Sequence, residues 1–340
     1  MRILPYTIPV IITSVFIATA STWFLWVAVG LVFLIAFLRE SVGKFSPSEV
    51  VSEYAFFHYD KSMANLKTCS GIFFTGFNLW IPYFLYTNQL SLPAYLIFLY
   101  SVLILNSNFA ISLAHDLMHS SRAGDRFLST FILLQNGFFY LESDHIFIHH
   151  RFVGTDADPA TARYGENIYS YFKRSISARF KMILLKGGTF PQSDESAIIA
   201  GNRVRLGICL VWLIISTLLG IQVFICILVQ YLLVTLIYES ITYIQHYGLI
   251  RQKTSDSRPE PVQLHHAWNC YYKTSAYMHF MMPVHSIHHL KEENLSTISD
   301  YTGPSMPLPF ASMMMTALFP SRWFKLMNEE IVFSIRTKHL

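Results

Sequence analysis

Charged residues are scarce in this sequence. Asp, Glu, Lys and Arg make up 14% of the 340 residues, whereas hydrophobic residues make up 53%. A soluble domain carries about 25% charged residues, so the composition argues against an ordinary soluble protein and predicts an integral membrane protein. The formal net charge is only +4, which indicates that nucleic acid is not a partner.

Cysteine is also rare. The chain has four cysteines, Cys69, Cys209, Cys226 and Cys270, which lie far apart and form no C-x-x-C pair. We therefore expect neither disulfides nor a cysteine-bound metal. Because iron–sulfur clusters are held by cysteine thiolates, we also expect these residues to contain no electron-donor domain of that kind.

Internal repeats and low-complexity tracts are absent, so the sequence predicts a single membrane domain over residues 1–340. Apolar runs predict an all-α integral membrane protein with about six transmembrane helices, at roughly 3–20, 23–38, 69–86, 93–113, 206–219 and 223–241. The mixed segments 114–205 and 242–340 are expected to form a helical cap.

The distribution of basic residues predicts the topology. Lys and Arg are missing from the turns at 21–22, at 87–91 and near Gly220. They lie instead before the first predicted span and after the second, fourth and sixth. Because cytoplasmic segments are enriched in Lys and Arg, we expect these segments, and with them the whole cap, on the cytoplasmic side.

Histidine forms the clearest pattern. Nine of the 14 histidines gather in four short motifs: His115 and His119; His145, His149 and His150; His246; and His285, His288 and His289. Neutral imidazole is the commonest protein ligand for iron, copper, zinc and nickel. Scattered structural or surface histidines would rarely produce two close-spaced triplets and an i,i+4 pair, so the pattern predicts a metal site.

The second motif, H-x-x-x-H-H, predicts how its side chains point. On an α-helix, residues four apart share a face, so His145 and His149 are expected to point at the same spot. His150 lies beside that face and is expected to reach a second metal. Nine donors exceed the needs of one ion, since iron takes up to six ligands and zinc usually four. We therefore expect two metals with about three to five histidines each.

The donor set and its place in the chain indicate the chemistry. Structural zinc sites prefer closed sets that include cysteine, whereas redox iron needs open positions for oxygen. A site at the membrane interface implies an apolar substrate that arrives from the lipid. The residues thus favour a di-iron oxygenase. A divalent-metal transporter is the alternative from another class, but transport sites lie near the bilayer midplane, and these motifs lie near the ends of predicted spans.

Three further segments carry a family resemblance. Residues 158–169 resemble the segment that follows the second histidine motif in the membrane alkane hydroxylase family. Residues 243–251 are similar to that family's N-Y-I-E-H-Y-G-L signature, which the related fatty acid desaturases lack, and residues 265–269 resemble its H-H-S-W-N. Together with the histidine motifs, the resemblance to the alkane and xylene monooxygenases covers most of the chain.

The resemblance implies that all nine motif histidines ligate two iron ions in the cap of a six-helix membrane domain. It implies hydroxylation of an unactivated C–H bond of an alkane or lipid-like chain, with O2 and two electrons. The implied electron donor is rubredoxin or another iron–sulfur protein with its reductase. The expected location is a membrane, the bacterial inner membrane, with the active site on the cytoplasmic side. Desaturation of a fatty acyl or other lipid chain stays open as the alternative outcome.

The sequence departs from the family beside the histidines. Asp116 and Asp144 stand where the family has Glu, Gln245 replaces a Glu, and Ile287 replaces an Asp. Because carboxylates beside ligating histidines orient them, these departures bear on the substrate more than on the metal site.

Other polar residues near the motifs have two interpretations. His265 and His266 are candidates for the same supporting role as Asp116, Asp144 and Gln245, or for cap packing. Asp156 and Asp158 either assist proton delivery or form a turn and helix cap.

Overall fold

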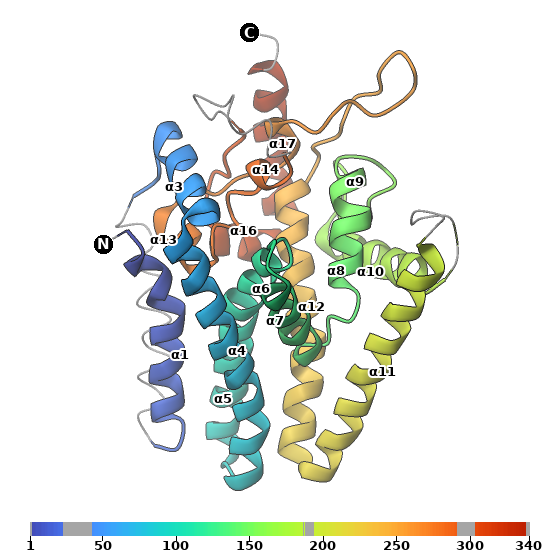
Figure 1. Ribbon diagram of the computed structural model, residues 1–340. Coiled ribbons are helices and arrows are strands. Elements are labelled where there is room, and N and C mark those ends of the chain that lie inside the picture. Colours follow the sequence, from blue (N-terminus) through green and yellow to red (C-terminus); the bar gives the residue numbers. More distant parts are fainter. Residues whose placement is uncertain (1, 23–42, 186, 188–193, 291–302, 338–340) are drawn as a thin grey trace.

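The computed structural model describes residues 2–22, 43–185, 187, 194–290 and 303–337. Within these ranges the regular elements are helices, and β pairing is limited to isolated bridges such as the one between Lys44 and Tyr272. Figure 1 shows long helices bundled on one side and shorter helices and loops gathered as a cap on the other. The all-α prediction is therefore confirmed for the described part of the chain.

Three continuous helical runs are long and apolar enough to cross a membrane. The first, Leu92–Leu117, consists of α5 (Leu92–Leu105), the π-helical turn η2 (Asn106–Ala110) and α6 (Ile111–Leu117). The other two are α11 (Glu195–Leu219) and α12 (Ile221–His246). They contain the predicted spans at 93–113, 206–219 and 223–241.

The other three predicted spans are not established in this way. The run at 3–20 forms η1 (Leu4–Thr7) and α1 (Ile8–Thr19), which together make a shorter apolar helix. The run at 69–86 lies within α4 (Lys61–Thr87), which is not among the three runs above. The span at 23–38 lies outside the described residues. Six spans therefore stay a prediction.

Helix α12 is longer than its apolar run. His246 was expected just past the end of the last span, but it is the final residue of α12. Every residue from Tyr238 to His246 is buried. This last part of the helix is covered by protein and accommodates polar residues such as Glu239 and Gln245. A prediction based on the length of the apolar run therefore ends the helix too early.

Local sequence sets where the long helices begin and turn. Asp60 caps α4 by accepting the backbone N–H groups of Ser62 and Met63. Gly220 has a φ of 126°, a conformation that glycine adopts without steric cost, and it separates α11 from α12. The two helices consequently run back along each other, as Figure 1 shows.

The cap consists of shorter helices from several separate parts of the chain. They are α3 (Pro47–Tyr59), α8 (Leu141–Ser143), η3 (Asp144–His149), α9 (His150–Phe152), α10 (Ile168–Leu184), η4 (Leu264–His266), α13 (Lys273–Met278), α14 (His285–His288), α16 (Phe310–Ala317) and α17 (Pro320–Thr337). Helix α7 (Ala123–Gln135) packs instead among the long helices, against α4 and α6 (Figure 1). One hydrophobic core fills the helix bundle, and a second packs α16 and α17 against the end of α12. Tyr243, Trp268 and Trp323 are fully buried in that second core, so the end of α12 that carries His246 is held rigidly.

Candidate metal centre

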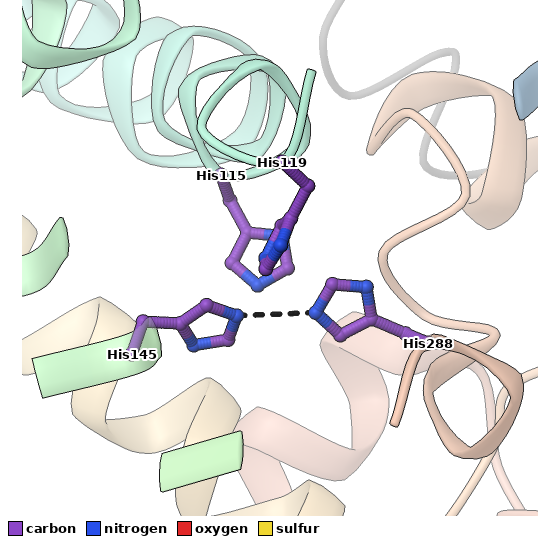
Figure 2. A group of neighbouring side chains, drawn as sticks. All are labelled: His115, His119, His145 and His288. Atoms are coloured by element: carbon purple, nitrogen blue, oxygen red, sulfur yellow. Dashed lines mark hydrogen bonds between the residues drawn. The ribbon is translucent and has the colours of Figure 1, made fainter. Parts of the chain in front are cut away.

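The structure gathers the nine motif histidines into two neighbouring clusters. Cluster 1 is His115, His119, His145, His150 and His288. Four of its members each offer one ring nitrogen within 4.8 Å of the others, and Figure 2 shows these four rings turned toward a common point. His150 joins them, because its Nε2 lies 2.9 Å from Nε2 of His145 and 3.1 Å from Nε2 of His288.

Cluster 2 is His149, His246, His285 and His289. All four side chains are buried, and each offers a ring nitrogen within 4.8 Å of the others. Nε2 of His285 lies 3.0 Å from Nε2 of His246 and 2.9 Å from Nε2 of His289. Helices α12, α14 and η3 therefore meet at this cluster, although their sequences are far apart.

The division of the second motif differs from the sequence prediction. His145 and His149 were expected to point at the same spot, with His150 at the second metal, but His145 and His150 share cluster 1 and His149 belongs to cluster 2. The reason is that Asp144–His149 is a π-helix, in which the backbone N–H of His150 bonds to the carbonyl of His145. The i,i+5 hydrogen bond brings residues five apart to the same side of the helix, whereas the prediction assumed an α-helix.

Adjacent histidines are divided between the clusters twice. His149 belongs to cluster 2 and His150 to cluster 1, while His288 belongs to cluster 1 and His289 to cluster 2. One peptide bond on η3–α9 and another at the end of α14 thus bridge the two clusters.

The nitrogen positions fit bound cations. In cluster 1, the Nε2 atoms of His145, His150 and His288 are mutual neighbours at 2.9–3.1 Å. Each Nε2 atom of a neutral imidazole is either a hydrogen-bond donor or an acceptor, so at least two of the three atoms must be of the same kind. Hydrogen bonding alone therefore leaves at least one pair of nitrogen atoms that repel each other. Two imidazole nitrogens bound about 2.1 Å from one ion, at a right angle to each other, lie about 3.0 Å apart. The spacing in cluster 1 is therefore that of ligands around a shared cation.

Burial prepares these imidazoles to bind metal. Burial, assisted by the charges of the neighbouring histidines, lowers the pKa of His145, His150, His288 and His289 well below the usual value. The rings are consequently neutral at pH 7 and keep a lone pair. Metal binding requires this protonation state of histidine.

Asp158 supports cluster 2 directly. Its Oδ2 lies 2.9 Å from Nδ1 of His149, and it also accepts hydrogen bonds from Thr161 and from the backbone N–H of Ala160. Burial raises the pKa of Asp158, but His149 and Thr161 outweigh burial and lower it to about 2. The carboxylate holds the proton of His149 on Nδ1 and turns Nε2, which is buried and has no other partner in the described protein, toward the cluster.

The residues that sequence reasoning assigned to this supporting role lie elsewhere. Asp116 pairs with Lys67 at 3.0 Å, Asp144 approaches Arg179 at 3.4 Å, and the side chain of Gln245 donates to the carbonyl of Met282. Among the side-chain bonds of the described residues, none joins these three to a motif histidine. Ile287, the fourth departure from the family, is buried in the hydrophobic core.

A buried arginine behind the centre was not anticipated. Nη1 of Arg179 on α10 lies 2.9 Å from Glu239 on α12 and 3.4 Å from Asp144, which begins η3. All three side chains are at most 2% exposed. Arg179 thereby ties together the two helical segments that deliver His246 and His145. No local sequence signal marks Arg179, because its partners are distant in the chain.

His265 and His266 lie outside both clusters. Together with Glu260 they bring potential ligand atoms within 4.8 Å of one another. However, Nδ1 of His266 accepts the backbone N–H of Gln263, and Nε2 faces Glu260 at 3.1 Å. An imidazole that accepts at Nδ1 carries its proton on Nε2, so His266 has no free lone pair for a metal and instead fixes the loop.

A pocket of about 740 Å³ reaches cluster 1. Its lining includes His119, His150 and His288 together with polar side chains from α3, α4 and the turn between α6 and α7. His119 lies two residues beyond the end of α6 and is exposed. Cluster 1 is therefore accessible from a polar surface.

Comparison with known proteins agrees with this architecture. The sequence profile of the fatty acid desaturase family matches residues 90–297, which is more than half of the chain. The protein belongs to the fatty acid desaturase family.

Within that family, the chain is similar to bacterial hydroxylases. It is 29% identical over 230 residues to alkane 1-monooxygenase of Pseudomonas putida and 30% identical over 230 residues to alkane 1-monooxygenase 1 of Alcanivorax borkumensis. Each match covers 66% of this chain and 57% of the relative. It is also 23% identical over 222 residues to the hydroxylase component of the xylene/toluene monooxygenase of Pseudomonas putida. The predicted resemblance is confirmed, and the chain spans less than two thirds of the length of these relatives.

Proposed function

We propose that the protein is a di-iron membrane monooxygenase that hydroxylates an unactivated C–H bond of an apolar chain. The observation that carries the proposal is the pair of adjacent all-histidine clusters, five imidazoles in one and four in the other, at the ends of apolar helices. Its similarity to alkane and xylene/toluene monooxygenases supports the same reaction.

The reaction balances with one molecule of O2. The substrate C–H bond and O2, with two electrons and two protons, give an alcohol and one water. Two irons held by the nine histidines would supply the activation of O2. The chain itself holds the ligands: Asp158 fixes the orientation of His149, and Arg179 secures the segments that carry His145 and His246.

The position of the clusters supports an apolar substrate from the bilayer. His115 lies in the last turn of the run Leu92–Leu117, and His246 ends α12. Both helices are long and apolar enough to cross a membrane, so a chain dissolved in lipid could approach along them. A metal transporter is less consistent with this arrangement, because its site would lie near the middle of the spans.

We propose that the electrons come from a partner protein. The four cysteines of the chain lie too far apart in sequence to form an iron–sulfur motif. The donor that we propose is rubredoxin or a similar iron–sulfur protein with its reductase. It would act on the cytoplasmic side, which is the side that the distribution of basic residues predicts for the cap.

Desaturation is the second candidate, because the family profile that matches is that of fatty acid desaturases. It consumes the same O2, electrons and protons but yields an alkene and two waters. The membrane-embedded protein should therefore be supplied with rubredoxin, reductase and ¹⁸O2, and products from alkanes, fatty acids and terpenes analysed by mass spectrometry. Alcohols containing ¹⁸O would support hydroxylation, and unlabelled alkenes would support desaturation. Absence of both, with iron bound, would contradict the proposal.

A further inference from the structure

The two clusters differ in their access to solvent. The pocket of about 740 Å³ is lined by three histidines of cluster 1, and no cluster 2 histidine is among its described lining residues. His119 is exposed and His150 and His288 are partly exposed. All four histidines of cluster 2 are buried. One face of cluster 1 therefore borders on solvent, and cluster 2 is enclosed.

The ligands also differ in how firmly they are held. His119 lies on the turn after α6 and is exposed, so its side chain can rotate away with little loss of packing. In cluster 2, His149 is fixed by Asp158 at 2.9 Å and His246 ends a helix that is packed under the cap. Release of His149 or His246 requires movement of packed core, which costs far more than movement of a surface turn.

The pocket is large and polar enough for a hydrated cation. Water occupies about 30 Å³ per molecule, so an ion with six waters needs roughly 200 Å³, well below the pocket volume. Hydroxyl and carboxylate oxygens line it, from residues that include Tyr54, Ser120 and Asp125, while the basic side chain of Lys67 in the same lining is paired with Asp116. Oxygen donors of this kind can replace waters of hydration one at a time.

We propose that this pocket is a metal-exchange port: a divalent cation enters and leaves cluster 1 through it, whereas the ion in cluster 2 is exchanged only when the cap opens. The inference rests on the proposed function for the presence of two ions. The port makes the two positions unequal, with one labile ion and one retained ion in each chain.

Chelation kinetics test the port. The full chain in lipid nanodiscs, loaded with Fe(II) under nitrogen, is mixed with bathophenanthroline disulfonate, a charged chelator whose iron complex is coloured. About one iron per chain should be released rapidly and the second at least about tenfold more slowly, since it waits for local opening. Release of both irons in one phase would overturn the inference. A loaded chain that holds no iron would contradict the proposed function instead.

Variants of the pocket rim identify the route. Ser121→Trp should slow the rapid phase, because Ser121 is exposed and lines the pocket. Ala123→Trp is the matched control, since Ala123 is exposed two residues away and is not among the lining residues. Tyr59→Ala, which opens the rim, should accelerate the rapid phase. The slow phase should be unchanged in all three. Equal rates in wild type, Ser121→Trp and Tyr59→Ala would overturn the port.

Discussion

Replacement of Asp158 should weaken the binding of one metal ion out of two. Asp158 is 1% exposed and holds Nδ1 of His149 at 2.9 Å while it accepts two further hydrogen bonds. Its pKa of about 2 means that the carboxylate is charged at neutral pH. Asp158→Ala removes the charge and leaves His149 free to rotate or to change tautomer.

The expected size of the effect follows from these contacts. Loss of a carboxylate that supports a ligating histidine costs about 10- to 100-fold in metal affinity, which is about 1.4–2.7 kcal/mol. Asp158→Ala should lie at the upper end, because it also deprives the buried Thr161 hydroxyl of its acceptor. Asp158→Asn keeps the shape and an acceptor oxygen but loses the charge, and charge-assisted hydrogen bonds are about twice as strong as neutral ones. It should lie at the lower end.

A competitive titration measures the effect. The metal-free chain is titrated with Fe(II) or Co(II) against a chelator of known affinity, and the two binding steps are fitted separately. One step should weaken and the other should keep its affinity, because Asp158 contacts cluster 2 only. Asp156→Ala is the control, since Asp156 lies in the same turn with its side chain 91% exposed. If Asp158→Ala and Asp156→Ala titrate alike, the assignment of Asp158 is refuted.

Three other predictions follow from the same geometry. His246→Ala should abolish oxygen-dependent product formation and lower the iron content while expression is unchanged, and Gln245→Ala should be far milder; full iron and activity in His246→Ala would contradict its place in cluster 2. Arg179→Met should lower the free energy of unfolding by about 3–5 kcal/mol because it breaks a buried ion pair. The control, Arg205→Met, removes an ion pair whose side chains are 28% and 25% exposed and should lower it by about 1 kcal/mol or less. Thermal unfolding of the two variants measures the difference. Burial lowers the pKa of His150 in the folded state, so the unfolded state binds more protons below about pH 6.5. The free energy of unfolding of the metal-free protein should therefore fall by up to about 1.4 kcal/mol per histidine for each pH unit below that value. A free energy of unfolding that stays constant between pH 7 and 5 would contradict this sign.

The sequence was sufficient to find the histidines but not to sort them. Imidazole spacing predicted two metals with three to five donors each, and the structure forms clusters of five and four. The assignment of His145, His149 and His150 failed because the hydrogen bonds of a π-helical turn span one residue more than those of an α-helix, and composition does not reveal that difference.

The side chains that support the clusters in the structure are not those that the sequence suggested. Asp116, Asp144 and Gln245 were chosen because they adjoin histidines in the sequence, but neighbours on a helix point about 100° apart and face different surroundings. Asp158 acts on His149 from nine residues away, across a turn. Arg179 and Glu239 meet across 60 residues. Contacts of this kind are tertiary, and only the fold brings them together.

The paired histidines have a mechanical consequence. A trans peptide bond is stiff and holds successive Cα atoms about 3.8 Å apart. Each of the pairs His149–His150 and His288–His289 contributes one ring to cluster 1 and the other ring to cluster 2. Covalent bonds on opposite sides of the centre therefore restrict the distance between the two metal positions. Breathing of the helix bundle in a fluctuating bilayer can tilt this unit as a whole but can hardly stretch it. Two adjacent histidines at the end of a motif thus indicate a centre that holds two ions at a fixed separation. If either histidine of such a pair were replaced, this covalent constraint on the separation would be lost.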